Sequence, residues 1–174
     1  MDEPGPSPRT SSTFARHCTE RIGFVVSLRP ITPANRQAVE ALRVSASQEQ
    51  FVSGVPESLA EAAAHPDAHA LYWAVYADDT PVGFVMIADE VDNPEYIPQF
   101  LWKLFIDARY QRHGFGTAAL DLIVEYFRGR PGVDVLTTSA GQGDGSPIPF
   151  YERYGFERTG EMHENEVVLR LKLR

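Results

Sequence analysis

Apolar residues gather along the chain into seven short runs, separated by polar segments rich in Gly, Pro, Asp and Asn. β-Branched and aromatic side chains are frequent in these runs, which is typical of strands bounded by turns. The last run alternates apolar Leu169 and Leu171 with charged Arg170 and Lys172, as a strand with one buried face does. The sequence therefore predicts strands over residues 24–29, 70–77, 81–88, 99–106, 133–139, 156–162 and 166–173.

Other stretches carry apolar residues at helical spacing. Val39, Leu42 and Ala46 would share one face of a helix, and Leu59 and Ala63 would share a face of the next. The sequence predicts helices over 34–47, 56–64, 118–127 and 147–154. Because a turn sequence joins the second and third strands, we expect them to form an antiparallel hairpin. Interleaved strands and helices indicate a mixed α/β fold.

Composition narrows the class of protein. The chain has 174 residues, of which 43% are hydrophobic, enough for one core. We expect a single domain over 23–174 after a disordered leader over 1–22, which is rich in Pro, Ser and Thr. The net charge of −8 argues against non-specific nucleic-acid binding. No apolar run approaches the ~20 residues of a membrane span. A single cysteine fits the reducing cytoplasm, where we expect the protein.

The segment after the fourth strand is the strongest candidate for a ligand site. It contains two glycines, Gly114 and Gly116, flanked by Arg112 and His113, and leads into the third helix. A helix N-terminus offers unpaired N–H groups and a positive dipole, and glycine lets an anion approach closely. The spacing also resembles a dinucleotide fingerprint, but the glycines follow the strand late, and no acidic residue ends the next strand. A phosphate-binding loop is therefore predicted.

Two motifs together resemble the GNAT superfamily of acyl-CoA-dependent N-acetyltransferases. The first is Gln-x-x-Gly-x-Gly over 111–116, and the second is Phe-Tyr-Glu-Arg-Tyr-Gly-Phe over 150–156. The resemblance runs from Val25 to Leu173. It implies a central seven-stranded mixed sheet with about four helices, splayed between strands 4 and 5. It also implies direct transfer of an acetyl group from acetyl-CoA to a primary amine, without a metal, and homodimers are common in the family.

The resemblance also implies roles for individual residues. The main chain of Leu104 and Ile106 would hold the pantetheine arm as an added strand would, and Phe105 between them is also expected to contact the cofactor. The loop would cradle the pyrophosphate with Gln111, Arg112, His113, Gly114, Phe115, Gly116 and Thr117. Tyr151 falls where the family places the tyrosine that protonates the departing thiolate. Asp144 stands where an asparagine is often found beside the cofactor. The fourth strand has no carboxylate, so the expected base is Glu90, with Glu95 or Asp92 as alternatives.

Within the superfamily the chain looks like the bacterial spermine/spermidine acetyltransferases. This likeness rests on less specific matches, such as Gln50-Phe51-Val52 and Thr159-Gly160-Glu161. A polyamine site needs spaced carboxylates and aromatic rings, and the expected substrate-binding residues are Glu49, Phe51, Glu95 and Trp102. An aminoglycoside, an amino acid or another small amine would suit the same features, and so would a non-catalytic acyl-CoA-binding module. Lys103, a charge inside an apolar strand, should pair with an acid.

Overall fold

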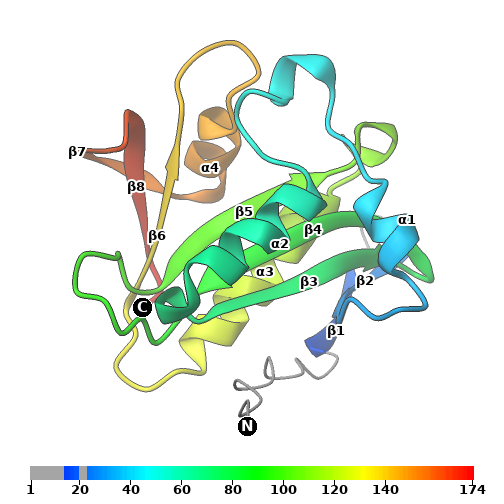
Figure 1. Cartoon of the computed structure of the whole chain (residues 1–174), viewed down its shortest axis with the longest axis horizontal. Helices are drawn as coiled ribbons and strands as arrows, with labels where there is room; N and C mark the ends of the chain where they lie inside the picture. Colours follow the sequence, from blue (N-terminus) through cyan, green and yellow to red (C-terminus); the bar gives the residue numbers. More distant parts are fainter. Residues whose placement is uncertain (1–13, 20–22) are drawn as a thin grey trace, which may run out of the picture.

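The computed structural model describes residues 14–19 and 23–174. Within this part of the chain, eight strands form one sheet in the order β1-β2-β3-β4-β5-β6-β8-β7 (Figure 1). Neighbouring strands are antiparallel except β5 and β6, which are parallel. The strands are β1 Phe14–Thr19, β2 Phe24–Arg29, β3 Ala70–Ala77, β4 Thr80–Ala88, β5 Phe100–Ile106, β6 Val135–Ala140, β7 Glu157–His163 and β8 Glu166–Lys172.

All seven predicted strands are present, and both predicted hairpins, β3–β4 and β7–β8, are confirmed. Strand β1 is additional. It pairs antiparallel with β2 and lies within the predicted leader, so the expectation of disorder is wrong for residues 14–19. The rest of that leader, 1–13 and 20–22, lies outside the described residues.

Helices cover both faces of the sheet (Figure 1). They are α1 Arg36–Glu40, α2 Val55–Ala64, α3 Phe115–Arg128 and α4 Ile148–Tyr154. Leu122, Ile123 and Phe127 of α3 are fully buried in the larger core. Val39 of α1 and Val55 of α2 belong to a second, smaller core on the other face. No helix in the described ranges has the length and apolarity to cross a membrane.

The predicted helix over 34–47 is wrong beyond Glu40, where α1 ends. After Glu40 the backbone forms hydrogen bonds with the segment that follows β5. The Arg43 N–H donates to Asp107 Oδ2 at 2.9 Å, and the Arg43 carbonyl accepts from the Ala108 N–H at 2.8 Å. These bonds use backbone groups that a longer helix would need for itself, so tertiary contacts override the helical spacing.

Strands β5 and β6 part after a short seam. Only Phe100 and Leu101 of β5 pair with β6, opposite Thr137 and Thr138. The cause is a bulge, because Met86 pairs with Lys103 while Ile87 pairs with Leu101, which leaves Trp102 as an extra residue. A bulge bends its strand and shifts the alternation of its peptide groups. The predicted splay between the fourth and fifth strands is thus confirmed, and it opens next to the glycine loop.

Candidate active site

A buried carboxylate, Asp107, fixes the start of the glycine loop directly after β5. Asp107 is buried and accepts the Arg109 N–H at 2.9 Å, the Arg109 Nε at 2.8 Å and the Arg43 N–H at 2.9 Å. Burial acts to raise the pKa of this carboxyl, but these hydrogen bonds and the charge of Arg109 together hold the pKa below its ordinary value. Asp107 therefore remains ionised and anchors the start of the loop.

Helix α3 begins at the second half of the loop. Gly114, its N-cap, has φ of 84°, a left-handed conformation that favours glycine. The first intrahelical bond there runs from the Ala118 N–H to the Gly114 carbonyl at 3.0 Å. The N–H groups of Phe115, Gly116 and Thr117 precede it and belong to the unpaired first turn. The loop thus presents the N–H donors that the sequence predicts.

A cleft of about 440 Å³, here called the β5 cleft, runs from this loop along β5. It is walled by the helix start, by the β6–α4 loop and by the segment around Gln48. Its charged lining residues are Arg112 and Arg153, and none of the described residues that line it is acidic. In a chain of net charge −8, a cleft with this lining favours an anionic ligand. A Cβ on Gly116 would lie 3.6 Å from the Phe150 ring, in ordinary contact with this wall of the cleft.

The peptide groups of β5 face the β5 cleft at alternate residues. The Phe105 carbonyl points toward β4, since it would lie 2.4 Å from a Cβ on Gly83. Peptide groups alternate in a strand, so those of Leu104 and Ile106 point into the cleft. Gln111 Nε2 donates to the Ile106 carbonyl at 2.8 Å and to Gln48 Oε1 at 2.7 Å, which ties the segment around Gln48 to the loop.

Tyr151 lies on α4, buried against the rings of Phe150 and Phe156 at centroid distances of 5.4 Å. Burial raises the pKa of its phenol to about 12, while a hydrogen bond with Thr138 acts in the opposite direction. Thr138 in turn donates to the Leu101 carbonyl at 2.9 Å, at the end of the β5–β6 seam. The phenol therefore sits where the two strands part and remains protonated at neutral pH.

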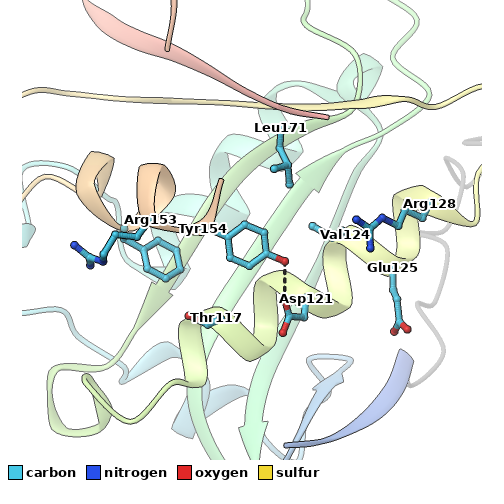
Figure 2. A pocket seen from close by; sticks show the side chains of 9 residues that line it. Thr117, Asp121, Val124, Glu125, Arg128, Arg153, Tyr154 and Leu171 are labelled. Atoms are coloured by element: carbon cyan, nitrogen blue, oxygen red, sulfur yellow. Dashed lines mark hydrogen bonds between the residues drawn. The ribbon is translucent and has the colours of Figure 1, made fainter. Parts of the chain in front are cut away.

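Helix α4 is fastened to α3 by its last tyrosine (Figure 2). The Tyr154 hydroxyl donates to Asp121 Oδ1 at 2.6 Å, across a hollow of about 700 Å³ that is lined by both helices. Burial, followed by this hydrogen bond to the carboxylate, raises the pKa of Tyr154. The hollow shares Thr117, Phe150 and Arg153 with the β5 cleft. The Tyr154–Asp121 bond thus holds the helix that carries Tyr151 and Phe150.

A second group of charges lies near the bulge. Lys103 Nζ lies 2.8 Å from Glu61 Oε2 of α2, which confirms that this lysine pairs with an acid. Glu166, the first residue of β8, feels the charges of both Lys103 and Glu61. Burial raises the pKa of the Glu166 carboxyl, and the positive charges of Lys103 and His163 offset part of that rise. The charge of Glu166 also acts on Tyr151. Glu166 is not among the residues expected from the sequence, because only the folded chain brings β8 near Lys103.

Glu90, the expected base, is held elsewhere. Its Oε1 lies 2.6 Å from Arg130 Nη2, and Arg130 Nη1 lies 2.7 Å from the buried Asp89. Asp89 also accepts from the Tyr126 hydroxyl at 2.8 Å, at the end of α3. Neither Glu90 nor Asp92 lines the β5 cleft among the described residues. The structure therefore places Glu90 in an ion-pair cluster and does not bring it together with the glycine loop.

The remaining predicted residues are dispersed. Phe51 lines the β5 cleft and would meet a Cβ on Gly141 at 3.2 Å. Glu49 lines a separate hollow beside Glu57. Trp102 lines a small cavity of about 170 Å³, here called the α2 cavity, whose lining residues are Glu61, His65, Ala68, Ala88, Tyr96, Ile97, Phe100, Trp102, His163 and Glu164. Glu95, His113 and Asp144 are exposed, and none of them lines the cleft or the α2 cavity. The four substrate-binding residues expected from the sequence thus do not form one site.

A splayed mixed sheet with a glycine loop at the start of α3 defines the class of acyl-CoA N-acyltransferases. The chain belongs to the acetyltransferase (GNAT) family, whose model matches residues 31–156. It is accordingly an acetyl-CoA-dependent N-acetyltransferase.

The chain is also similar in sequence to two relatives and in fold to two solved structures. The chain is 26% identical over 146 residues to a spermine/spermidine N(1)-acetyltransferase of Bacillus subtilis (strain 168), and the match covers 80% of this chain and 93% of the relative. A probable spermine N(1)-acetyltransferase of Bacillus subtilis subsp. natto is 25% identical with the same coverage.

Among structures, the PaiA N-acetyltransferase of Thermoplasma acidophilum, in complex with coenzyme A, has a TM-score of 0.59 at 16% identity and covers 84% of this chain and 98% of its own. The aminoglycoside acetyltransferase AAC(6′)-Ib, also with coenzyme A, has a TM-score of 0.65 at 17% identity and covers 84% and 94%. At such low identities these two likenesses show the fold.

Proposed function

We propose that the protein transfers the acetyl group of acetyl-CoA to a primary amine of a polyamine such as spermidine or spermine. The observation that carries this acceptor is the match to the spermine/spermidine N(1)-acetyltransferase of Bacillus subtilis. The match spans 93% of that relative, so it extends well beyond the two cofactor motifs. The expected cytoplasmic location and homodimer stay predictions from the sequence.

The β5 cleft has the donors that acetyl-CoA requires. A pyrophosphate needs cations and N–H groups, and these are Arg112, Arg153 and the first turn of α3. A pantetheine arm has two amides, and the peptide groups of Leu104 and Ile106 face the cleft to bind them as an added strand would. Bound there, acetyl-CoA supplies an activated thioester. The cofactor contacts expected from the sequence at Phe105 and Gln111–Thr117 belong to the same proposal.

Tyr151 is proposed as the acid that protonates the departing thiolate. With a pKa of about 12, its phenol still holds its proton across the neutral range, as a donor must. Thr138, whose hydroxyl donates to the Leu101 carbonyl at the β5–β6 seam, lowers the pKa of this phenol against the effect of burial. Tyr151 does not itself line the β5 cleft, but Phe150, the preceding residue of α4, does.

Two carboxylates compete for the role of base. Glu90 is the residue expected from the sequence, but its carboxylate is paired with Arg130. Glu166 shares the electrostatic environment of Tyr151, and burial raises its pKa toward the neutral range, where a carboxylate is a better base. We propose that Glu166 takes the proton of the attacking ammonium, directly or through water.

The test is release of free thiol from acetyl-CoA across a panel of amines. The panel contains spermidine, spermine, an aminoglycoside, free amino acids and a simple monoamine. We expect the highest kcat/KM for the two polyamines. Higher kcat/KM for an aminoglycoside or an amino acid would overturn the polyamine acceptor while keeping the acetyltransferase. CoA binding without thiol release for any amine would point to a binding module instead.

A further inference from the structure

We propose that the α2 cavity binds the second, non-reacting ammonium group of the acceptor amine. This inference rests on the proposed function and adds to it a location and a mode of recognition. The cavity is assembled from α2 and the turn after it, the end of β4, the segment from Tyr96 to Trp102 and the turn between β7 and β8. Because these four segments are spread over residues 61–164, no single motif reveals the cavity.

Aromatic rings supply the first feature that a cation requires. The His65 ring lies 6.0 Å from the Tyr96 ring and 6.2 Å from the Trp102 ring, measured between centroids. His65 Nδ1 also lies 2.9 Å from the Tyr96 hydroxyl, which fixes the two rings relative to one another. The face of an aromatic ring attracts an ammonium group, most strongly when the ring is Trp.

Negative charge supplies the second feature. Glu61 and Glu164 line the cavity, and the charge of the nearby Glu166 carboxylate reaches His163. Lys103 neutralises part of this charge through its ion pair with Glu61, which leaves Glu164 on the turn as the exposed carboxylate. A group of two cavity carboxylates and one adjacent lysine has a net negative charge, which complements a single ammonium group.

The position of the cavity links it to the reaction. Trp102 is the bulged residue of β5, so the cavity begins where the seam with β6 ends. Thr138, the partner of Tyr151, bonds the carbonyl of the preceding residue, Leu101. An acceptor whose reacting amine lies at the end of the β5–β6 seam can therefore extend its other end toward Trp102 and Tyr96.

The size of the cavity selects the shape of the acceptor. Its volume is about 170 Å³, whereas sites for drug-sized ligands take about 300–1,000 Å³. The space therefore suits one slender aminoalkyl arm and is too small for an aminoglycoside ring system. We infer that it favours linear diamines and polyamines over bulky amines and over monoamines that lack a second charge.

The experiment compares spermidine with n-butylamine, which has one ammonium group. The variants are Tyr96→Leu, which removes a ring, and Glu164→Gln, which removes the exposed carboxylate. We expect each to raise the KM for spermidine about tenfold. The KM for acetyl-CoA and the kcat/KM for n-butylamine should stay unchanged. The control is Glu157→Gln, the same substitution at the far end of the same hairpin. This variant should change neither the KM for spermidine nor the kcat/KM for n-butylamine.

The possible outcomes separate the two proposals. If wild-type enzyme acetylates spermidine but both variants keep its KM, or affect both amines alike, the cavity assignment is overturned and the proposed function stands. If wild-type enzyme does not acetylate spermidine, both are overturned. A thermal melt of each variant distinguishes lost folding from lost recognition, and spermidine-induced stabilisation of wild-type protein that is absent in folded variants supports the assignment independently.

Discussion

The β5 cleft and the α2 cavity adjoin opposite ends of one strand, and their linings carry opposite charges. The cleft includes Leu104–Ile106 and has Arg112 and Arg153 as its charged lining residues. The cavity includes Phe100 and Trp102 and has Glu61 and Glu164. Cofactor binding, as proposed, relies mainly on backbone N–H groups and glycines, whereas acceptor binding relies on side chains from four segments.

This difference has a physical origin. A phosphate is recognised by backbone geometry that many sequences can form, provided that glycine stands at the few positions where a Cβ would interfere. An amine is recognised by the placement of rings and carboxylates, which any element near the site can supply. The cofactor side should therefore respond mainly to changes of shape, and the acceptor side to changes of charge and ring.

The largest effect is expected at Tyr151, the proposed general acid. Tyr151→Phe should lower kcat by about 10²–10⁴-fold, the range for loss of a general acid, with little change in acetyl-CoA affinity. Steady-state thiol release and a separate CoA-binding measurement check this. Tyr72→Phe is the matched control, because Tyr72 packs against Phe84 in the smaller core on the other face of the sheet, and it should keep kcat. Wild-type turnover in Tyr151→Phe would remove the phenol from the mechanism.

The acceptor side is tested next through its candidate base. Glu166→Gln should lower kcat by about 10²-fold, at the lower end for general base catalysis. Because burial raises the pKa of Glu166, wild-type kcat/KM should rise with pH through that raised value as the carboxyl loses its proton. The variant should lack this acid limb in a pH–rate profile. If Glu90→Gln shows the loss and the altered profile instead, the assignment from the sequence is correct.

The anchor of the glycine loop should affect stability rather than chemistry. Asp107→Asn removes a charge that accepts several N–H groups, and we expect a loss of about 2 kcal/mol of unfolding free energy. The folded pKa of Asp107 lies below its ordinary value, so the stability that it contributes is complete above the unfolded pKa, about 4, and disappears as pH falls through the folded value. Urea unfolding of wild type and Asp107→Asn should show a difference in unfolding free energy at pH 7 that becomes smaller in acid. A difference that is constant with pH would contradict the role of the charge.

The smallest effect tests shape alone on the cofactor side. Gly116→Val fills the space beside Phe150 and should raise the KM for acetyl-CoA about tenfold, or ~1.4 kcal/mol, with the KM for the amine unchanged. Gly116→Ala places its Cβ in ordinary contact with that ring and should have a milder effect. Equal changes in the KM for acetyl-CoA and the KM for the amine would show that cofactor binding and acceptor binding do not depend on separate sites.

The sequence supports a prediction of the strands and the glycine loop because each depends on local pattern, whereas the splay was expected from the resemblance to the GNAT superfamily. Alternating apolar residues mark the strands, and Gly114 marks the left-handed N-cap of α3. The helix beyond Glu40 was mispredicted, because its spacing is helical but Arg43 bonds Asp107, 64 positions away. Such a contact has no local signal.

The same limit explains the acceptor side. Glu90 is a reasonable base in the sequence, yet Arg130 of the α3–β6 connection pairs with it. Glu166 looks like the first residue of an ordinary hairpin strand until β8 brings it near Lys103 and Tyr151. Trp102 and Tyr96 were each noticeable as aromatic residues, but only the folded chain places them around His65.

The short seam between β5 and β6 has a consequence for isotope exchange with solvent. The N–H of Asp107 donates to Val82 of β4, and the Phe105 peptide faces the same way, whereas those of Leu104 and Ile106 face the cleft. Deuterium should therefore enter one strand at every second residue, quickly on the cleft side and slowly on the β4 side. Occupation of the cleft by a pantetheine arm would slow the fast set alone, so a single strand reports on its own ligand.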